Sequence, residues 1–208
     1  MPETKRQLWN DRYSGRELIW SAGPNLTFSE QVADLQPGRA LDVACGEGRN
    51  AIWLAEKGWD VTAIDFSDVG IDKARQIAER RGVSVNWIVG DVSTHALPAA
   101  QFDLVAVLYL HTSLKEREMW LANVLASVAP GGRFLYIGHD QSNIEHGVGG
   151  PKDPDLLPTL KEFSNALGGF EIEKAEVIER PIINDPGHSH TLTGIALDTL
   201  VRARRKQG

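Results

Sequence analysis

Short apolar runs alternate with longer segments of helical periodicity through the middle of the chain. Five runs rich in Val, Ile, Leu and Ala lie at residues 40–44, 59–64, 83–89, 102–108 and 133–137. Three of them are almost continuously apolar, which is typical of parallel strands that are covered on both faces. The pattern therefore predicts a parallel sheet with helices packed on both sides.

The segments between these runs carry helix-boundary signals. Ser67 and Ser113 are predicted N-caps of two helices, the first ending near Gly82 and the second at Pro130-Gly131-Gly132. Strand–helix–strand repetition of this kind predicts right-handed crossovers and an open, doubly wound α/β sheet.

The pattern changes after His139. A loop rich in Gly and Pro covers residues 140–158, and a short helix is predicted over 159–166. Two strand-like runs follow at 170–178 and 191–201. Two long strands in succession predict an antiparallel pair that closes one edge of the sheet.

Composition narrows the class of protein. The chain has 208 residues, with 22 Lys and Arg against 28 Asp and Glu, a formal net charge of −6 and one cysteine, Cys45. Net acidity argues against a protein that mainly binds nucleic acid, and a lone cysteine suits a reducing compartment. No apolar run reaches membrane-spanning length, and the first residues lack the apolar core of a signal peptide. These features predict a cytoplasmic protein with neither nucleic-acid nor membrane partners.

The first strand leads into a glycine-containing loop, Asp42-Val43-Ala44-Cys45-Gly46-Glu47-Gly48, and then into a helix predicted over 50–57. Glycine permits unusual backbone dihedrals and lets a ligand approach the main chain. Taken alone the glycine pair is weak evidence, because many strand–helix turns carry glycine for steric reasons.

Two acidic residues strengthen the interpretation. Asp65 ends the second strand and Asp91 the third, so both lie at the edge of an open α/β sheet where ligands bind. A carboxylate at Asp65 can accept hydrogen bonds from ribose hydroxyls, and Asp91 can accept one from an adenine amine. The glycine-containing loop, Asp65 and Asp91 follow three successive strands in order, and together they predict an adenosine-containing cofactor.

Two cofactor classes fit the loop. Gly46, Gly48 and Ala51 also match the dinucleotide fingerprint, which keeps an NAD(P)-dependent oxidoreductase as an alternative. Asp42 places a carboxylate just before the loop, where a pyrophosphate would be disfavoured and a cationic sulfonium and ammonium favoured. The chain also lacks a second catalytic domain of the usual dehydrogenase kind. S-adenosylmethionine is therefore the predicted cofactor and S-adenosylhomocysteine its product.

These motifs resemble those of the class I S-adenosylmethionine-dependent methyltransferases, especially the small-molecule group with tellurite-resistance and thiopurine-type enzymes. The resemblance extends to Phe102-Asp103-Leu104-Val105 and Pro130-Gly131-Gly132, and Ala44 departs from it where the family often has glycine. It implies a Rossmann-like, seven-stranded, three-layer sandwich whose last strand is antiparallel. The cofactor-binding residues that it implies, together with the motifs above, are Trp20, Asp42, Ala44, Cys45, Gly46, Gly48, Asp65, Phe66, Gly90, Asp91, Val92 and Leu108.

The resemblance also implies a division of one methyltransferase domain over residues 1–208. Residues 1–36 form a helical lid, 37–139 the cofactor-binding core, and 140–208 the substrate-side loop, helix and closing strands. Trp9 and Tyr13 lie in the lid segment, where they either cover the cofactor or pack as core.

His111 follows the fourth strand and is the predicted general base for a hydroxyl or amine acceptor. The alternative is a polar residue that caps the next helix or contacts the cofactor. His139-Asp140 is a second candidate. His188 and His190 have no evident third ligand, so no metal site is predicted.

The predicted function is transfer of a methyl group to O, S or N of a small molecule by in-line displacement. Residues 108–111 lack the Asn/Asp-Pro-Pro-aromatic run of enzymes that methylate nucleic-acid amines. A non-catalytic S-adenosylmethionine-binding module is a further alternative. The sequence does not indicate an oligomeric state.

Overall fold

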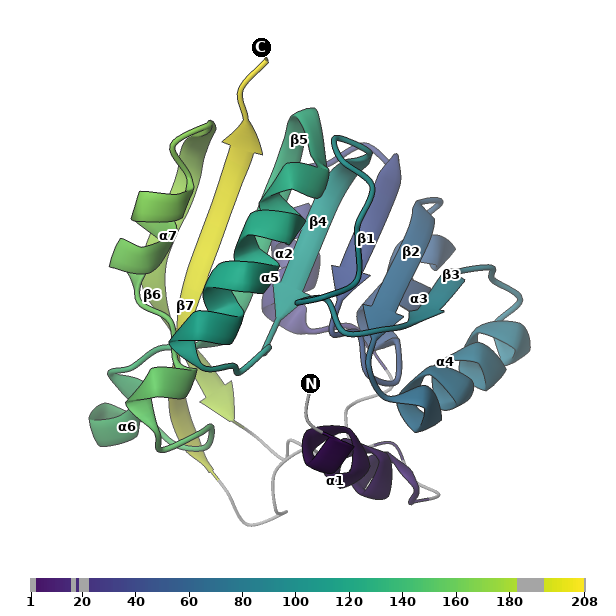
Figure 1. The fold of residues 1–208 in the computed structure, drawn as a ribbon, viewed down its shortest axis with the longest axis horizontal. Coiled ribbons are helices and arrows are strands. Elements are labelled where there is room, and N and C mark those ends of the chain that lie inside the picture. Colours follow the sequence, from purple (N-terminus) through teal and green to yellow (C-terminus); the bar gives the residue numbers. More distant parts are fainter. Residues whose placement is uncertain (1–2, 16–17, 19–22, 183–192, 208) are drawn as a thin grey trace.

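The computed structural model describes residues 3–15, 18, 23–182 and 193–207 (Figure 1). Within these residues seven strands form one sheet in the order β3-β2-β1-β4-β5-β7-β6. Their bounds are β1 Arg39–Val43, β2 Asp60–Asp65, β3 Asn86–Val89, β4 Phe102–Leu108, β5 Val128–His139, β6 Phe170–Ile182 and β7 Gly194–Arg205.

The first five strands are parallel, whereas β7 runs antiparallel to both of its neighbours, β5 and β6. The predicted fold class, a doubly wound and mostly parallel sheet with an antiparallel last strand, is therefore confirmed. Because parallel strands all end at the same edge, the loops after β1, β2, β3 and β4 gather there.

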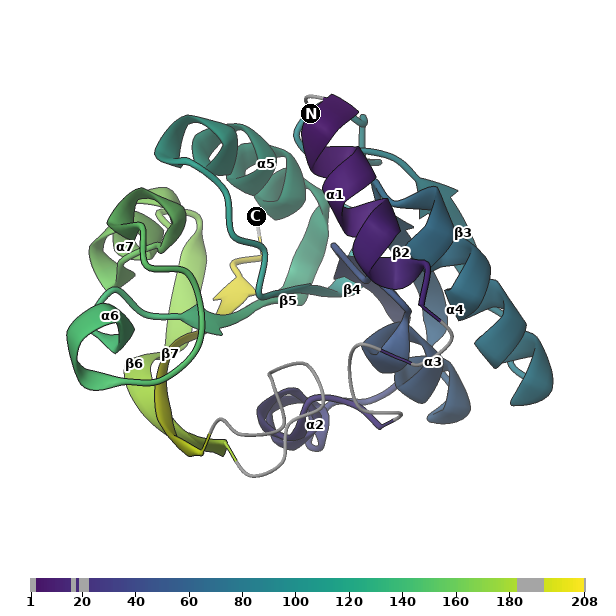
Figure 2. The ribbon, with the colours of Figure 1, turned by 90° about the horizontal axis from the view of Figure 1, so that it is seen from below.

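Helices pack on both faces of the sheet (Figures 1 and 2). The helices are α1 Glu3–Tyr13, α2 Leu26–Val32, α3 Arg49–Glu56, α4 Asp68–Arg80, α5 Leu114–Ser127, α6 Asn143–His146, the 3-10 helix η1 Pro154–Leu156 and α7 Leu160–Ala166. α5 and α7 cover one face and α2 and α3 the other, whereas α1 and α6 lie at the carboxyl edge of the parallel strands.

Alternation along the buried strands divides the core into two layers. Leu41 and Val43 of β1 belong to a cluster with Trp120 of α5 and Phe163 of α7. Ala40 belongs to the opposite cluster, which includes side chains of α2 and α3. This alternation is what the period of a strand dictates, and it makes the central strands apolar on both faces.

Caps set the helix boundaries as predicted at Ser67, whose hydroxyl accepts a hydrogen bond from the Gly70 amide at 3.0 Å. Ser113 forms a capping box with Glu116 at the start of α5. None of the described helices combines the length and apolar character that a bilayer crossing needs.

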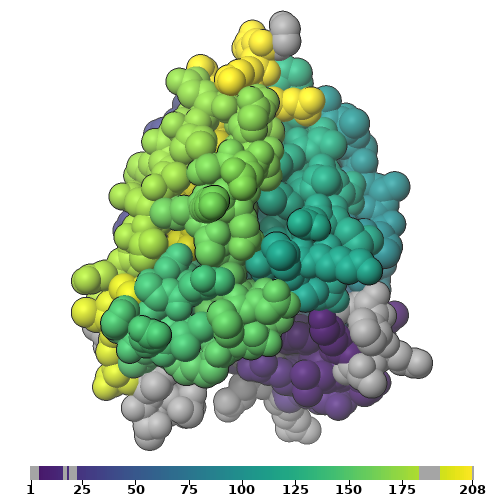
Figure 3. All heavy atoms as spheres, turned by 60° about the vertical axis from the view of Figure 1, so that its left-hand side comes forward, coloured from purple at the N-terminus to yellow at the C-terminus, as the bar shows by residue number. Residues whose placement is uncertain are grey.

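Several predicted boundaries differ from the structure: β5 and β6, for example, are longer than predicted, at Val128–His139 and Phe170–Ile182. β3 is shorter than residues 83–89 and begins at Asn86. α5 ends at Ser127, and residues 130–132, which were predicted to end this helix, lie inside β5 instead. The pairing of β5 with β4 shifts in register between Phe102 and Leu104 of β4. This irregularity accommodates a proline and two glycines within a strand. The loop 140–158 contains α6 and η1, and Figure 3 shows this green segment at the same end of the molecule as α1.

Candidate cofactor and acceptor site

The loop after β1 turns sharply through left-handed backbone conformations. Ala44, Gly46 and Gly48 have φ of 56°, 54° and 77°. Gly46 and Gly48 take this conformation without a steric penalty, whereas Ala44 is strained by about 1 to 2 kcal/mol. Strain of this kind concentrates at functional sites.

The two glycines are also needed for space. A Cβ on Gly48, the N-cap of α3, would come within 2.6 Å of the Trp87 ring and 2.9 Å of Ala74. A Cβ on Gly46 would come within 2.6 Å of the Tyr13 hydroxyl. Gly48 therefore allows the helices to pack, and Gly46 allows α1 to lie against the loop.

Asp65 ties the end of β2 to this loop. Its Oδ2 accepts a hydrogen bond from the Gly46 amide and its Oδ1 one from the Ser67 amide, both at 2.8 Å. Burial raises the pKa of Asp65 to about 6, although these two hydrogen bonds oppose the rise. At neutral pH the group is therefore mostly an anion held in place by main-chain donors.

Asp42 lies beneath the loop with only 1% of its surface exposed. Burial raises the pKa of Asp42 to about 7, with opposing effects from the Ala51 amide and Arg49. Its buried Oδ2 has no hydrogen-bond partner among the described residues. An unsatisfied carboxylate oxygen costs free energy, so a cationic or hydrogen-bond-donating ligand would stabilise it.

Two adjoining cavities open at this edge of the sheet. The first encloses about 1170 Å³, including space open to solvent, and the second about 270 Å³. The first is lined by Lys5, Trp9, Tyr13, Leu18, Asp42, Ala44, Cys45, Gly46, Glu47, Arg49, Asn50, Ile52, Asp65, Phe66, Ile77, Arg81, Leu108, Tyr109, Leu110, His111 and Thr112. The second is lined by Ala44, Ile64, Asp65, Phe66, Gly90, Asp91, Val92, Ser93, Leu110 and Thr112.

Most of the predicted site residues therefore lie together. Those along the first cavity are Asp42, Ala44, Cys45, Gly46, Asp65, Phe66, Leu108 and His111, and those along the second are Gly90, Asp91 and Val92. Asp65 lines both cavities and joins them. Gly48 lines neither, and Trp20, His188 and His190 lie outside the described residues.

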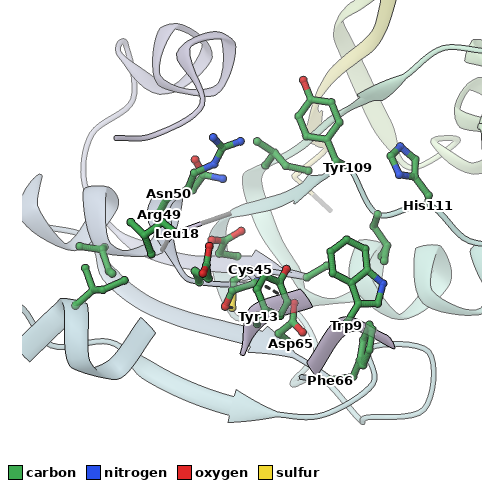
Figure 4. A pocket seen from close by; sticks show the side chains of 18 of the residues that line it. Trp9, Tyr13, Leu18, Cys45, Arg49, Asn50, Asp65, Phe66, Tyr109 and His111 are labelled. Carbon is green, nitrogen blue, oxygen red and sulfur yellow. Dashed lines mark hydrogen bonds between the residues drawn. The ribbon is translucent and has the colours of Figure 1, made fainter. Parts of the chain in front are cut away.

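α1 covers the first cavity. Trp9 and Tyr13 both line it and stack on each other with ring centroids 5.5 Å apart (Figure 4). Asn10 donates a hydrogen bond to Asp68 at 2.8 Å and accepts one from Ser67 at 2.6 Å. A further tie joins Lys5 to Glu116 at 3.0 Å. α1 is thus attached to the N-termini of both α4 and α5, on either side of the cavity.

The loop after β4 forms another wall. Tyr109 has φ of 51°, which is unusual for a bulky residue, and its ring lies 6.4 Å from that of His111. Burial lowers the pKa of His111 to about 3, and its buried Nε2 has no hydrogen-bond partner within the part of the chain that the structure describes. The cap of α5 is Ser113, so capping by His111 is not its role.

A buried polar cluster lies behind His111. Asp198 of β7 accepts hydrogen bonds from the Tyr109 hydroxyl at 2.7 Å and from Arg180 Nε at 2.6 Å. His139 Nδ1 lies 3.2 Å from the other oxygen of Asp198, and the His139 ring stacks on His111 at 5.6 Å. Burial would raise the pKa of Asp198, but the neighbouring His139 and Arg180 lower it to about 2.

Asp140, the neighbour of His139 in the sequence, has a different environment. It accepts hydrogen bonds from the Thr199 hydroxyl at 2.7 Å and from the Ser142 amide at 2.9 Å. The carboxylate beside His139 is therefore Asp198 rather than Asp140. Sequence reasoning missed Asp198 because only the pairing of β5 with β7 sets it opposite His139.

Comparison with known proteins agrees with this geometry. Residues 40–132 match the family model described as "Methyltransferase domain". A curated relative is the ubiquinone biosynthesis O-methyltransferase of Coxiella burnetii, 28% identical over 128 residues, or 62% of this chain and 55% of that protein. The chain thus spans about half the length of this curated relative.

Solved structures share the fold. TehB from Haemophilus influenzae superimposes with a TM-score of 0.73 at 14% identity, over 97% of this chain and 67% of that one. A structure described as "Conversion of a Disulfide Bond into a Thioacetal Group during Echinomycin Biosynthesis" has a TM-score of 0.73 at 20% identity, covering 97% and 93% of the two chains.

Residues 40–132 thus match a methyltransferase domain, and the fold of the whole described chain is shared with solved structures such as TehB. The family resemblance stated from the sequence is confirmed. The comparisons favour neither the NAD(P)-dependent oxidoreductase nor the non-catalytic binding module.

Proposed function

We propose that this chain binds S-adenosylmethionine in the two adjoining cavities and transfers its methyl group to a hydroxyl of a small aromatic compound. The observation that carries the proposal is the position of Asp65, which lines both cavities at the end of β2. A nucleoside that spans the cavities would present its ribose hydroxyls to this carboxylate.

The residues present fit the cofactor. Asp91 lies in the smaller cavity, where an adenine amine would find an acceptor. The unsatisfied Oδ2 of Asp42 suits a cationic ligand, and Gly46, which also lines the first cavity, carries no side chain. When bound, S-adenosylmethionine supplies a methyl group on a positively charged sulfur, which keeps the electron pair of the broken sulfur–carbon bond.

The chain's own contribution is to orient the reactants, exclude water and remove a proton. Trp9 and Tyr13 cover the cavity from α1, and aromatic faces favour a nearby cation. His111 is neutral at physiological pH, so we assign its Nε2 as the base that takes the acceptor's hydroxyl proton. The alternative, in which His111 only contacts the cofactor, predicts loss of cofactor affinity on its substitution.

The proposed acceptor class rests on the residues that line the first cavity and on the curated relative. The side chains of Trp9, Phe66, Tyr109 and His111 give the cavity aromatic surfaces that suit a flat acceptor (Figure 4). The Coxiella relative is an O-methyltransferase by name. We also propose a cytoplasmic site of action without nucleic-acid or membrane partners, on the net charge of −6 and the single cysteine. The division into lid, core and substrate-side segment belongs to the same proposal.

A labelled-donor screen tests this function. Phenols, thiols, amines and metalloid oxyanions are offered with methyl-labelled S-adenosylmethionine, and labelled product is expected with phenols. Asp65→Asn is expected to weaken S-adenosylhomocysteine binding by about tenfold or more. Asp60→Asn, at the exposed start of β2 on the opposite edge, is the matched control and should bind normally. Transfer to thiols or amines alone would refute the hydroxyl assignment, and equal binding by both variants would refute the role of Asp65.

A further inference from the structure

The polar cluster behind His111 is buried more deeply than the cavity it adjoins. Asp198 is fully buried and His139 is 3% exposed, and neither lines the cavity. Burying an ionised carboxylate is costly unless several donors surround it. Two donors bond to its Oδ2 here, the Tyr109 hydroxyl after β4 and Arg180 of β6, and His139 at the end of β5 lies 3.2 Å from Oδ1.

Asp198 lies beside both of the rings that contact His111. The Tyr109 hydroxyl donates to its Oδ2, and His139 Nδ1 faces its Oδ1. The His139 ring lies nearly parallel to that of His111, with an interplanar angle of 18°, and the Tyr109 ring meets it at 67°. The orientation of His111 is thus set from two sides by groups that share one carboxylate.

The Asp198 cluster also carries the charge that a base at this position needs. His111 is buried, and taking a proton would place a positive charge there without water to stabilise it. His139 on the adjacent face opposes that charge, and Asp198 favours it. Since Asp198 stays ionised at neutral pH, its negative charge is present throughout the working range.

We propose that Asp198 is a positioning residue for His111: it fixes the two rings that pack against His111, and its charge offsets the positive charge that His111 gains. The proton that leaves the acceptor hydroxyl passes to His111 Nε2 as the new oxygen–methyl bond forms, and it is later released to solvent. This inference rests on the proposed function of the site.

The test compares two accepted phenols of similar size. One carries a nitro group and is ionised at the assay pH, and the other carries a methyl group and must lose its proton during the reaction. Asp198→Asn should lower turnover of the un-ionised phenol by about tenfold or more, and of the ionised phenol by less than about threefold. Asp140→Asn, another buried carboxylate near the same edge, is the matched control and should not separate the two phenols. Equal losses on both phenols with Asp198→Asn would overturn the inference and leave a structural role.

A second variant controls for misfolding. Asp198→Asn removes the carboxylate that pairs with Arg180, and this loss could destabilise the fold by itself. Asp198→Asn combined with Arg180→Gln removes both charges and should show the same separation of the two phenols. A second readout needs no cofactor. The side-chain NMR resonances of His111 are recorded in the cofactor-free protein, because they report the orientation and surroundings of its ring. They should move with the double variant and stay in place with Asp140→Asn, and unchanged resonances with the double variant would overturn the inference.

The two proposals fail in different ways. If the wild type methylates no hydroxyl compound, the proposed function fails, while the His111 resonances still test Asp198. If the wild type methylates phenols but the variants lose both phenols equally, only the inference fails.

Discussion

The hydroxyl of Tyr13 occupies the space into which a side chain at Gly46 would project. A Cβ built on Gly46 would lie 2.6 Å from that hydroxyl, and the φ of Gly46 is +54°. α1, which covers the site, therefore packs closely against the loop after β1, although Tyr13 and Gly46 are far apart in the sequence.

Gly46→Ala should consequently disturb both the loop and α1. We expect S-adenosylhomocysteine affinity, measured by calorimetry, to fall about tenfold or more, with a stability loss of about 1 to 2 kcal/mol from backbone strain. Gly82→Ala is the matched control, because Gly82 has φ of +68° and open space around its Cβ position. It should lose similar stability but no affinity. Equal affinity losses in the two variants would contradict the contact between loop and α1.

The backbone conformation of Ala44 is strained. Its φ of 56° is unfavourable for any residue with a Cβ, so Ala44→Gly should raise the free energy of unfolding of the cofactor-free protein by about 0.5 to 1 kcal/mol. Ala100→Gly, at φ of 52° in an exposed turn, should give a similar gain. Urea denaturation measures both. A loss of stability in Ala44→Gly alone would show that the methyl group of Ala44 makes packing contacts that outweigh the strain.

Asp42 makes stability depend on pH. Because its pKa is raised from 3.8 to about 7 in the folded protein, the folded state keeps a proton that the unfolded chain releases. This contribution is complete below pH 3.8 and is lost as pH rises through about 7. We expect the cofactor-free wild type to lose about 4 kcal/mol between about pH 5 and 7.5, of which about two thirds comes from Asp42 and the rest from Asp65. Asp42→Asn should show a shallower decline, to which Asp65 still contributes. Parallel pH profiles would contradict the assignment.

The ties of α1 predict the rate at which the cofactor leaves. Asp68 receives hydrogen bonds from Asn10 and Arg6, which lower the pKa of Asp68 and attach α1 to α4. Asp68→Ala should speed dissociation of S-adenosylhomocysteine about two- to fivefold, since exposed pairs contribute about 1 kcal/mol or less. Stopped-flow fluorescence of the tryptophans measures the rate. Asp72→Ala, which removes an exposed pair within α4 alone, is the control. Similar rates in the wild type and Asp68→Ala would mean that α1 does not limit release.

The sequence allowed the sheet to be predicted because its signals are local. Near-continuous apolar runs mark the buried strands, and the caps Ser67 and Ser113 mark where two helices begin. Asp65 could be assigned to the ligand-binding edge because it ends a parallel strand. The fold class required no knowledge of long-range packing beyond the rules of parallel crossovers.

The acceptor end could not be predicted in the same way. Asp198 lies in the middle of β7 without any local motif, and it meets His139 only because β7 inserts antiparallel beside β5. The left-handed backbone of Tyr109 carries no sequence signal, since no glycine marks it. Such contacts depend on tertiary pairing, which a single sequence does not display.

The central claim is that a nucleoside cofactor binds at the carboxyl edge, across both cavities. The most direct measurement is an amide NMR titration of the labelled protein with S-adenosylhomocysteine, and with NADH for comparison. The account predicts saturable shifts with S-adenosylhomocysteine that concentrate at Gly46, Asp65, Asp91 and His111 and spare Gly38 and Gly82. Shifts that concentrate elsewhere, or that arise with NADH and not with S-adenosylhomocysteine, would contradict it.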